Sequence, residues 1–141
     1  MAYTLDNKRM NLVDSLLEGA EADRDVLKKQ LAMGDDPSIP RDVDFVLYAK
    51  DLEKAELVRD FVHDNSYGRS FVQEVPQNPP DSQHRIIVQV FMPTTQHALC
   101  AVSALMACLA KLYDLAYDGW GCEITKESNK PAHTTAGSAP V

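Results

Sequence analysis

Residues 96–116 limit the fold of this chain more than any other stretch, because they form a helical pattern that is apolar almost all the way round. Between positions 98 and 116 the polar residues are Ser103, Lys111 and Asp114. A helix with so few polar positions is normally covered on two sides. One side carries mostly large residues, which suit packing on a sheet: Leu99, Val102, Leu105, Met106, Leu109, Leu112, Tyr113 and Ala116. The other side carries small residues, which suit a helix packed closely against it: Cys100, Ala101, Ala104, Ala107 and Cys108. We expect the sheet on the first side, and the N-terminal helix or a second copy of the chain on the other.

The segments around this helix alternate between strand and helix patterns. Residue types predict strands over 43–49, 70–75, 85–92 and 120–126, and a helix over 52–63 in addition to the long one. Asp51 stands where it would cap that shorter helix. The order β-α-β-β-α-β is that of the ferredoxin-like fold. We therefore expect an α+β protein, a two-layer sandwich with both helices on one face of a four-stranded antiparallel sheet.

Two extra helices are expected before the sheet. Apolar residues recur at helical spacing over 5–18 and again over 23–33, and Gly19 would end the first helix. Prolines mark the stretch that follows as a loop, in which Asp35 and Asp36 would be solvated. The sequence thus predicts three parts: an N-terminal helical segment at 1–34, a ferredoxin-like α+β domain at 35–126, and a disordered tail at 127–141.

The acidic charge of the chain is concentrated in one window. The formal net charge is −7 over 141 residues, and residues 35–64 hold nine acidic side chains against four basic ones, a net of −5. Such a surface disfavours direct binding of nucleic acid, which depends on Lys and Arg. It suits a basic protein partner, with a plain solvated surface as the alternative.

Reactive and metal-binding side chains form no recognisable site in the sequence. The four histidines are scattered, and the three cysteines lack C-x-x-C spacing, which fits reduced thiols. His97 and Cys100 could share a metal ion, but two ligands are too few for a structural site. No glycine-rich phosphate loop is present. We expect a protein that is not an enzyme, with no catalytic residue, metal or cofactor.

A cytoplasmic location is expected from two features of the chain. No fully apolar run approaches the roughly 20 residues that a membrane span needs. The N-terminus also lacks the apolar core and cleavage site of a signal peptide.

The open face of the expected sheet is one candidate binding surface. Strand alternation places Asp44, Val46 and Tyr48 outward on the first strand, and Ile87, Gln89 and Phe91 outward on the third. Aromatic residues on such a sheet are typical of RNA-binding domains, but no Lys or Arg pattern flanks them here. A protein interface fits better, a homodimer being one form of it. The candidate contact residues are Tyr48, Phe91 and, from the edge strand, Trp120.

The helix over 52–63 offers a second candidate surface. Its carboxylates fall within about a quarter of the helix circumference, opposite the apolar stripe. They are Glu53, Glu56, Asp60 and Asp64, which we call the acidic stripe. Such a stripe could bind an arginine-rich segment of a partner, and a solvated face is the alternative.

The stretch LAYDGWG at 115–121 is the most distinctive in the chain. It resembles the YDGWG signature of RraB-type proteins, the regulators of ribonuclease E activity. In that family the motif links the last helix to the last strand, and the similarity of layout extends over roughly residues 10–126. Gly119 would permit the turn, and Trp120 would anchor it against the sheet or a helix.

The resemblance implies a non-catalytic protein that inhibits ribonuclease E by binding its basic scaffold region. The acidic window at 35–64 agrees with such a partner. The family often has a strongly acidic C-terminal tail, whereas the tail here, SNKPAHTTAGSAPV, is nearly neutral. The resemblance supplies no catalytic residues. A small-molecule sensor of ferredoxin-like fold remains as the alternative function.

Overall fold

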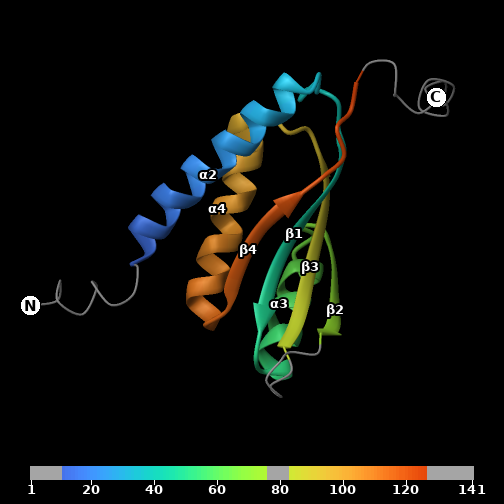
Figure 1. Ribbon diagram of the computed structural model, residues 1–141. Helices are drawn as coiled ribbons and strands as arrows, with labels where there is room; N and C mark the ends of the chain where they lie inside the picture. Colours follow the sequence, from blue (N-terminus) through green and yellow to red (C-terminus); the bar gives the residue numbers. More distant parts are fainter. Residues whose placement is uncertain (1–10, 76–82, 127–141) are drawn as a thin grey trace, which may run out of the picture.

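The structure is a computed structural model that describes residues 11–75 and 83–126. It has two layers, a four-stranded sheet and a layer of three helices (Figure 1). In chain order the elements are α2 (Leu12–Ala32), β1 (Arg41–Ala49), α3 (Leu52–Asp64), β2 (Arg69–Val75), β3 (Gln83–Met92), α4 (Gln96–Tyr113) and β4 (Ala116–Gly121). The expected α+β class and the β-α-β-β-α-β order after α2 are confirmed.

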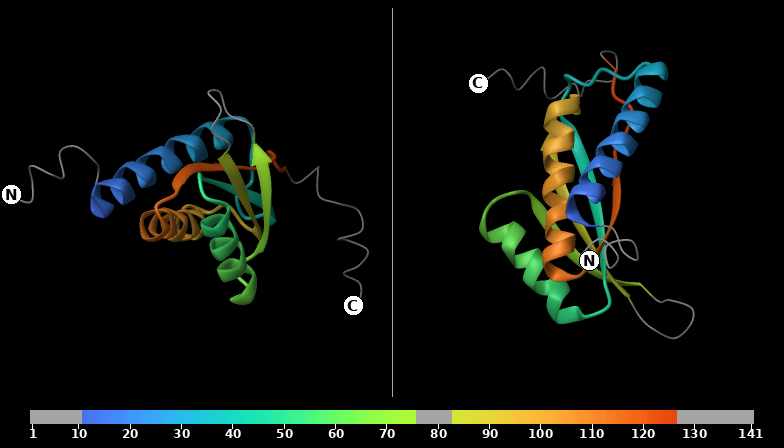
Figure 2. Two further views of the ribbon diagram at one scale, coloured as in Figure 1. Left: turned by 90° about the horizontal axis from the view of Figure 1, so that it is seen from below. Right: turned by 90° about the vertical axis from the view of Figure 1, so that its left-hand side faces the viewer.

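The sheet is antiparallel throughout, with strand order β2-β3-β1-β4. Both α3 and α4 lie on the same face of it, and α2 lies alongside α4 (Figure 2). The core sits between the helices and the sheet, because β1 alternates strictly and buries Val43, Phe45 and Leu47 completely on the helix side. The opposite face of the sheet carries no helix among the described elements.

The N-terminal helix α2 is one continuous helix, so the prediction of two helices separated at Gly19 was wrong. Asn11 caps the helix, its side chain accepting a hydrogen bond from the Asp14 backbone N–H at 2.8 Å. The buried face of α2 runs through Asp23 and Leu27 to the last turn and packs on α4. This packing outweighs the roughly 1 kcal/mol that a glycine costs inside a helix. The part of the first expected helix that precedes residue 11 lies outside the described residues.

The end of α4 and the start of β4 also differ from the prediction. The helix ends at Tyr113, because Asp114 adopts a left-handed conformation at φ 58° and its N–H bonds the Ala110 carbonyl. The last strand was expected at 120–126 and lies instead at Ala116–Gly121, so the YDGWG stretch is part of the strand rather than the link before it. Gly119, at φ 92°, lies next to a register irregularity in the pairing of β4 with β1.

By length and composition alone α4 could cross a membrane. In the structure it is a core helix: Leu99 and Met106 are fully buried against the sheet. Its small-residue side lies against α2, as expected for the intramolecular alternative. The sheet and α2 thus cover two sides of α4, but Leu112, which was expected on the sheet side, is 78% exposed.

Candidate functional site

The seven predicted contact residues occupy three separate places. The acidic stripe lies on α3, in the helix layer. Tyr48 and Phe91 lie on the opposite, open face of the sheet. Trp120 pairs with Phe45, whose side chain is buried on the helix side, so Trp120 faces the helices and not the open face. One flat interface cannot contact all seven side chains.

Most of the acidic stripe is exposed, and it is only partly neutralised. Asp60 accepts a hydrogen bond from Arg59 at 2.9 Å, and this bond raises the pKa of Arg59. Asp64 lies 3.4 Å from the His63 ring. Among the described residues Glu53 and Glu56 form no ion pair. The charge of Glu56 also acts on Arg59 and adds to its raised pKa, so the Arg59 guanidinium offsets part of the negative charge of the stripe.

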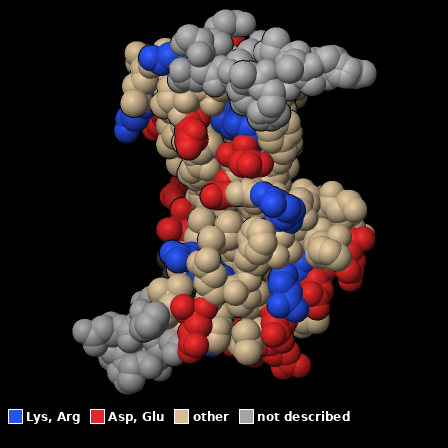
Figure 3. All heavy atoms as spheres, turned by 90° about the vertical axis from the view of Figure 1, so that its right-hand side faces the viewer, with Lys and Arg blue, Asp and Glu red and all other residues tan. Residues whose placement is uncertain are grey.

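The open face of the sheet exposes aromatic side chains. The pairing of Asp44 with Gln89 and of Val46 with Ile87 confirms which residues point outward. Phe91 is 70% exposed and Phe71, which sequence reasoning missed, is 44% exposed, with the Arg69 guanidinium 5.9 Å from its ring centre. Figure 3 shows this face, with uncharged surface between groups of acidic and basic side chains. A face of this mixed kind suits a protein contact.

Tyr48 and Phe91 lie at opposite ends of the open face. Phe91 pairs with Asp42, six positions before Tyr48 on the same strand. At about 3.3 Å per residue the two aromatic side chains are roughly 20 Å apart along the strand. Phe91 borders a hollow of about 610 Å³ together with His63 at the end of α3. Phe91 therefore lies near the end of α3, and Tyr48 is remote from that point.

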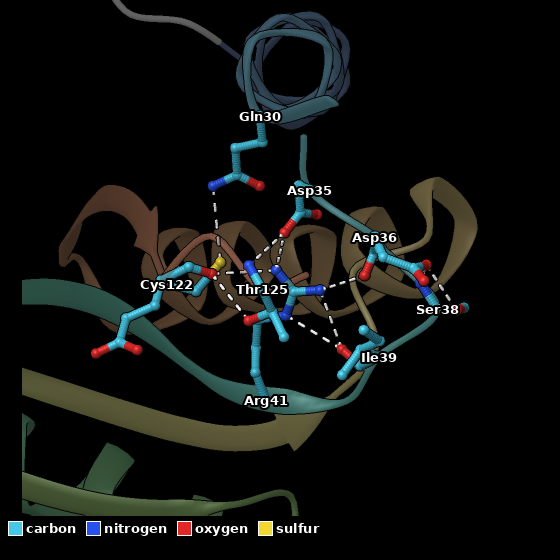
Figure 4. Close-up of polar contacts among 9 residues, drawn as sticks. Gln30, Asp35, Asp36, Ser38, Ile39, Arg41, Cys122 and Thr125 are labelled. Carbon is cyan, nitrogen blue, oxygen red and sulfur yellow. Dashed lines mark hydrogen bonds and ion pairs between the residues drawn. The ribbon is translucent and has the colours of Figure 1, made fainter. Parts of the chain in front are cut away.

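A buried polar cluster fixes the loop between α2 and β1 (Figure 4). Arg41 forms a buried ion pair with Asp35 and donates to the carbonyls of Asp36, at 2.6 Å, and Glu123, at 3.1 Å. Asp35 also accepts from the Thr125 N–H at 2.8 Å. The expectation that Asp35 is solvated was wrong, because its partners come from β1 and from the segment after β4. The cluster is structural, and because Arg41 also lies in the acidic window, the ion pair leaves the net charge of the window at −5.

The YDGWG motif joins the helices to the edge strand. The Trp120 indole N–H donates to the buried Asp23 carboxylate at 2.9 Å, and the Tyr117 hydroxyl lies 2.8 Å from the Ser103 hydroxyl. Burial strongly raises the pKa of Tyr117 above its ordinary value, and the nearby Asp23 adds to that effect. The anchoring role expected for Trp120 therefore has a definite partner on α2. Sequence reasoning missed Asp23, whose acidic side chain on the buried face of α2 was the available signal.

A groove lies between α2, α4 and β4, and nothing in the sequence analysis predicted it. Its volume is about 810 Å³, and it is lined in part by the motif residues Tyr117, Asp118 and Gly119. The described acidic residues on it are Glu18, Asp23, Asp114 and Asp118, against one basic residue, Lys111. Asp114 lies 3.9 Å from Lys54 of α3.

Metal-ligating side chains do not gather in the described part of the chain. No group of three or more His, Cys, Asp or Glu residues there could hold a metal ion. His97 and Cys100, the pair considered from the sequence, both lie near the start of α4. Burial raises the pKa of the Cys100 thiol, and the Asp23 carboxylate adds to the shift. A raised thiol pKa lowers the thiolate fraction and hence its metal affinity at neutral pH.

The fold defines a small α+β protein with a four-stranded antiparallel sheet and helices on one face. The family model described as regulator of ribonuclease activity B, RraB, matches residues 20–122, and the chain belongs to this family. The match begins in α2, after Gly19, and ends just beyond β4, so it includes the YDGWG motif and Asp23. Among the curated proteins none matches the chain.

Proposed function

We propose that this protein is a non-catalytic inhibitor of ribonuclease E, which acts in the cytoplasm by binding the nuclease. The observation that carries the proposal is the RraB family match over residues 20–122, more than half of the chain. The family's description supplies regulation of ribonuclease activity. Ribonuclease E as the target, and its basic scaffold region as the contact, follow from the resemblance in the YDGWG motif.

The acidic stripe supports a basic partner. Glu53, Asp60 and Asp64 are exposed on α3, and Glu56 is partly exposed beside them. Charges of one sign on one side of a helix attract an arginine-rich segment and speed its association. Since these charges are exposed, their effect is screened by salt. The contact should therefore weaken as the ionic strength rises.

The open face of the sheet supports a second contact of a different kind. Phe91 and Phe71 are exposed large apolar residues on it. Such residues contribute most to binding where they become buried at the centre of an interface. We propose that this face binds either the nuclease or a second copy of the chain, in addition to the charged contact.

The charge reversal Glu56→Lys with Asp60→Lys tests the acidic stripe. We expect the affinity for full-length ribonuclease E at low salt to fall about tenfold or more, and the dependence of the affinity on salt to become weaker. Binding is measured on immobilised nuclease at several salt concentrations.

The matched control is Glu21→Lys with Asp25→Lys. These residues are also four positions apart and exposed, but they lie on α2. The control changes the net charge by the same amount but leaves the stripe intact. Its affinity for ribonuclease E should therefore fall only by the small amount that long-range charge attraction contributes. Equal losses in the two variants would show that overall charge matters and that the stripe is not the contact.

A further inference from the structure

Asp23 in the groove between α2, α4 and β4 is a buried carboxylate without a counter-ion among the described residues. It is 6% exposed, and its Oδ1 accepts one hydrogen bond, from Trp120. It takes part in none of the ion pairs of the described part of the chain. Buried charges in proteins are normally paired, because removing them from water is costly. A basic group that enters the groove would neutralise this carboxylate.

The charged residues that line the groove beside Asp23 are mostly acidic. Glu18 and Asp118 lie on the groove, one from α2 and one from β4. The negative charge of Asp23 acts on both neighbouring elements. Burial is the main cause of the raised pKa of Tyr117 on β4 and of Cys100 on α4, and the charge of Asp23 raises both pKa values further. Lys111 is the one basic residue among the described residues lining the groove. The groove is thus complementary to a positively charged ligand.

The shape of the groove suits a long, slender side chain. Its walls carry small residues: Gly19, Ala22, Ala107, Ala110 and Gly119. Small walls leave room for the methylene stem of an arginine, while the guanidinium reaches a carboxylate with several parallel donors. A volume of about 810 Å³ is large enough for such a side chain together with part of the backbone that carries it.

We propose that this groove is the docking site for an arginine-bearing segment of a protein partner. The guanidinium of the arginine pairs with Asp23, and Glu18 and Asp118 bind the basic residues next to it. The proposal deepens the proposed function and rests on it only in taking the partner to be a protein. It also gives the YDGWG motif a role in binding: Trp120 positions the Asp23 carboxylate, and Asp118 supplies one side of the groove.

The variant Asp23→Asn separates binding from folding. The amide oxygen of asparagine still accepts from the Trp120 indole, while the negative charge is removed. The substitution removes a buried charge that lacks a counter-ion among the described residues, and burying such a charge is unfavourable. We therefore expect the melting temperature to stay the same or rise. The affinity for an arginine-bearing ligand should nevertheless fall at least about tenfold, since the buried pair is lost. Glu21→Gln, on the exposed side of α2 and outside the groove, is the matched control and should keep the affinity.

The probe is a short peptide of alternating arginine and glycine, titrated into the full-length ¹⁵N-labelled protein. We expect the amide shifts to concentrate at groove residues such as Gly19, Ala22 and Gly119, and to require higher peptide concentrations in the Asp23→Asn variant. Shifts confined to α3, or equal affinities of the variant and the wild type, would overturn the proposal.

A parallel titration with ribonuclease E separates this proposal from the proposed function. If the peptide occupies the groove but ribonuclease E does not bind the wild-type protein, the docking site stands and ribonuclease E is the wrong partner. If ribonuclease E binds wild type and Asp23→Asn equally and the peptide avoids the groove, the docking site is wrong and the proposed function stands.

Discussion

The buried ion pair of Asp35 and Arg41 shows how single residues hold this fold together. The guanidinium also bonds the carbonyls of Ile39 and Glu123, so one side chain joins the loop before β1 to the segment after β4. A sequence pattern cannot show this link, because Glu123 lies 82 positions from Arg41, and Thr125 lies 90 positions from Asp35. Two adjacent aspartates before a proline instead suggested a solvated loop.

We predict that Asp35→Asn lowers the free energy of unfolding by about 3 kcal/mol, because it leaves the Arg41 cation buried without a counter-charge. Denaturation in urea measures the change. Asp42→Asn is the control, since Asp42 is exposed and next to Arg41 in the sequence, and it should change the stability by about 0.5 kcal/mol or less. If Asp35→Asn lowers the free energy of unfolding as little as Asp42→Asn does, the ion pair does not have this structural role.

At the scale of elements, most helices and strands could be predicted from local patterns, and the errors lie at glycines and at one helix end. The strand β1 and the helix α3 with its Asp51 cap begin and end close to the predicted positions. Gly19 was misread as a helix end because local sequence does not reveal that α4 supports α2 on both sides of it. The start of β4 was misplaced because its pairing with β1 is a long-range contact.

Two glycine substitutions test these assignments. An added methyl group meets no atom within 4 Å at either Gly19 or Gly119, so the change in stability reports the backbone conformation. Gly19→Ala should raise the free energy of unfolding by about 0.5–1 kcal/mol, because alanine is favoured inside a helix. Gly119→Ala should lower it by about 1 kcal/mol or more, because its φ of 92° strains any other residue.

Thermal and urea unfolding of both variants measure the two changes. A destabilising Gly19→Ala would mean that the helix does end at this glycine, as the sequence suggested. A neutral Gly119→Ala would mean that the conformation at the motif glycine is easily relaxed.

At the scale of the whole molecule, the candidate binding residues do not form one surface. The acidic stripe and the open sheet face could be predicted, because helix and strand periodicities decide which residues share a face. The side of the sheet on which Trp120 lies depends on the pairing of β4 with β1, and the groove depends on the angle between α2 and α4. Neither of these is encoded in a local pattern, so the sequence alone could not place Asp23 beside the motif.

The two acidic features lie on one side of the molecule, which bears on the proposed inhibition. The stripe on α3 and the groove beside α2 are both acidic and both lie in the helix layer, whereas the exposed aromatic residues lie on the other side. A long basic segment that lies across the helix layer could contact both acidic features at once. The open sheet face would then remain available for a second copy of the chain.

Inhibition is measured as the rate at which full-length ribonuclease E cleaves a fluorescent RNA in the presence of increasing amounts of this protein. If the protein inhibits ribonuclease E through the acidic stripe, the rate falls at low salt and reaches a plateau, and high salt restores it. The variant Glu56→Lys with Asp60→Lys then requires more protein for the same effect. A rate that stays unchanged at every concentration of folded protein would contradict the proposed inhibition.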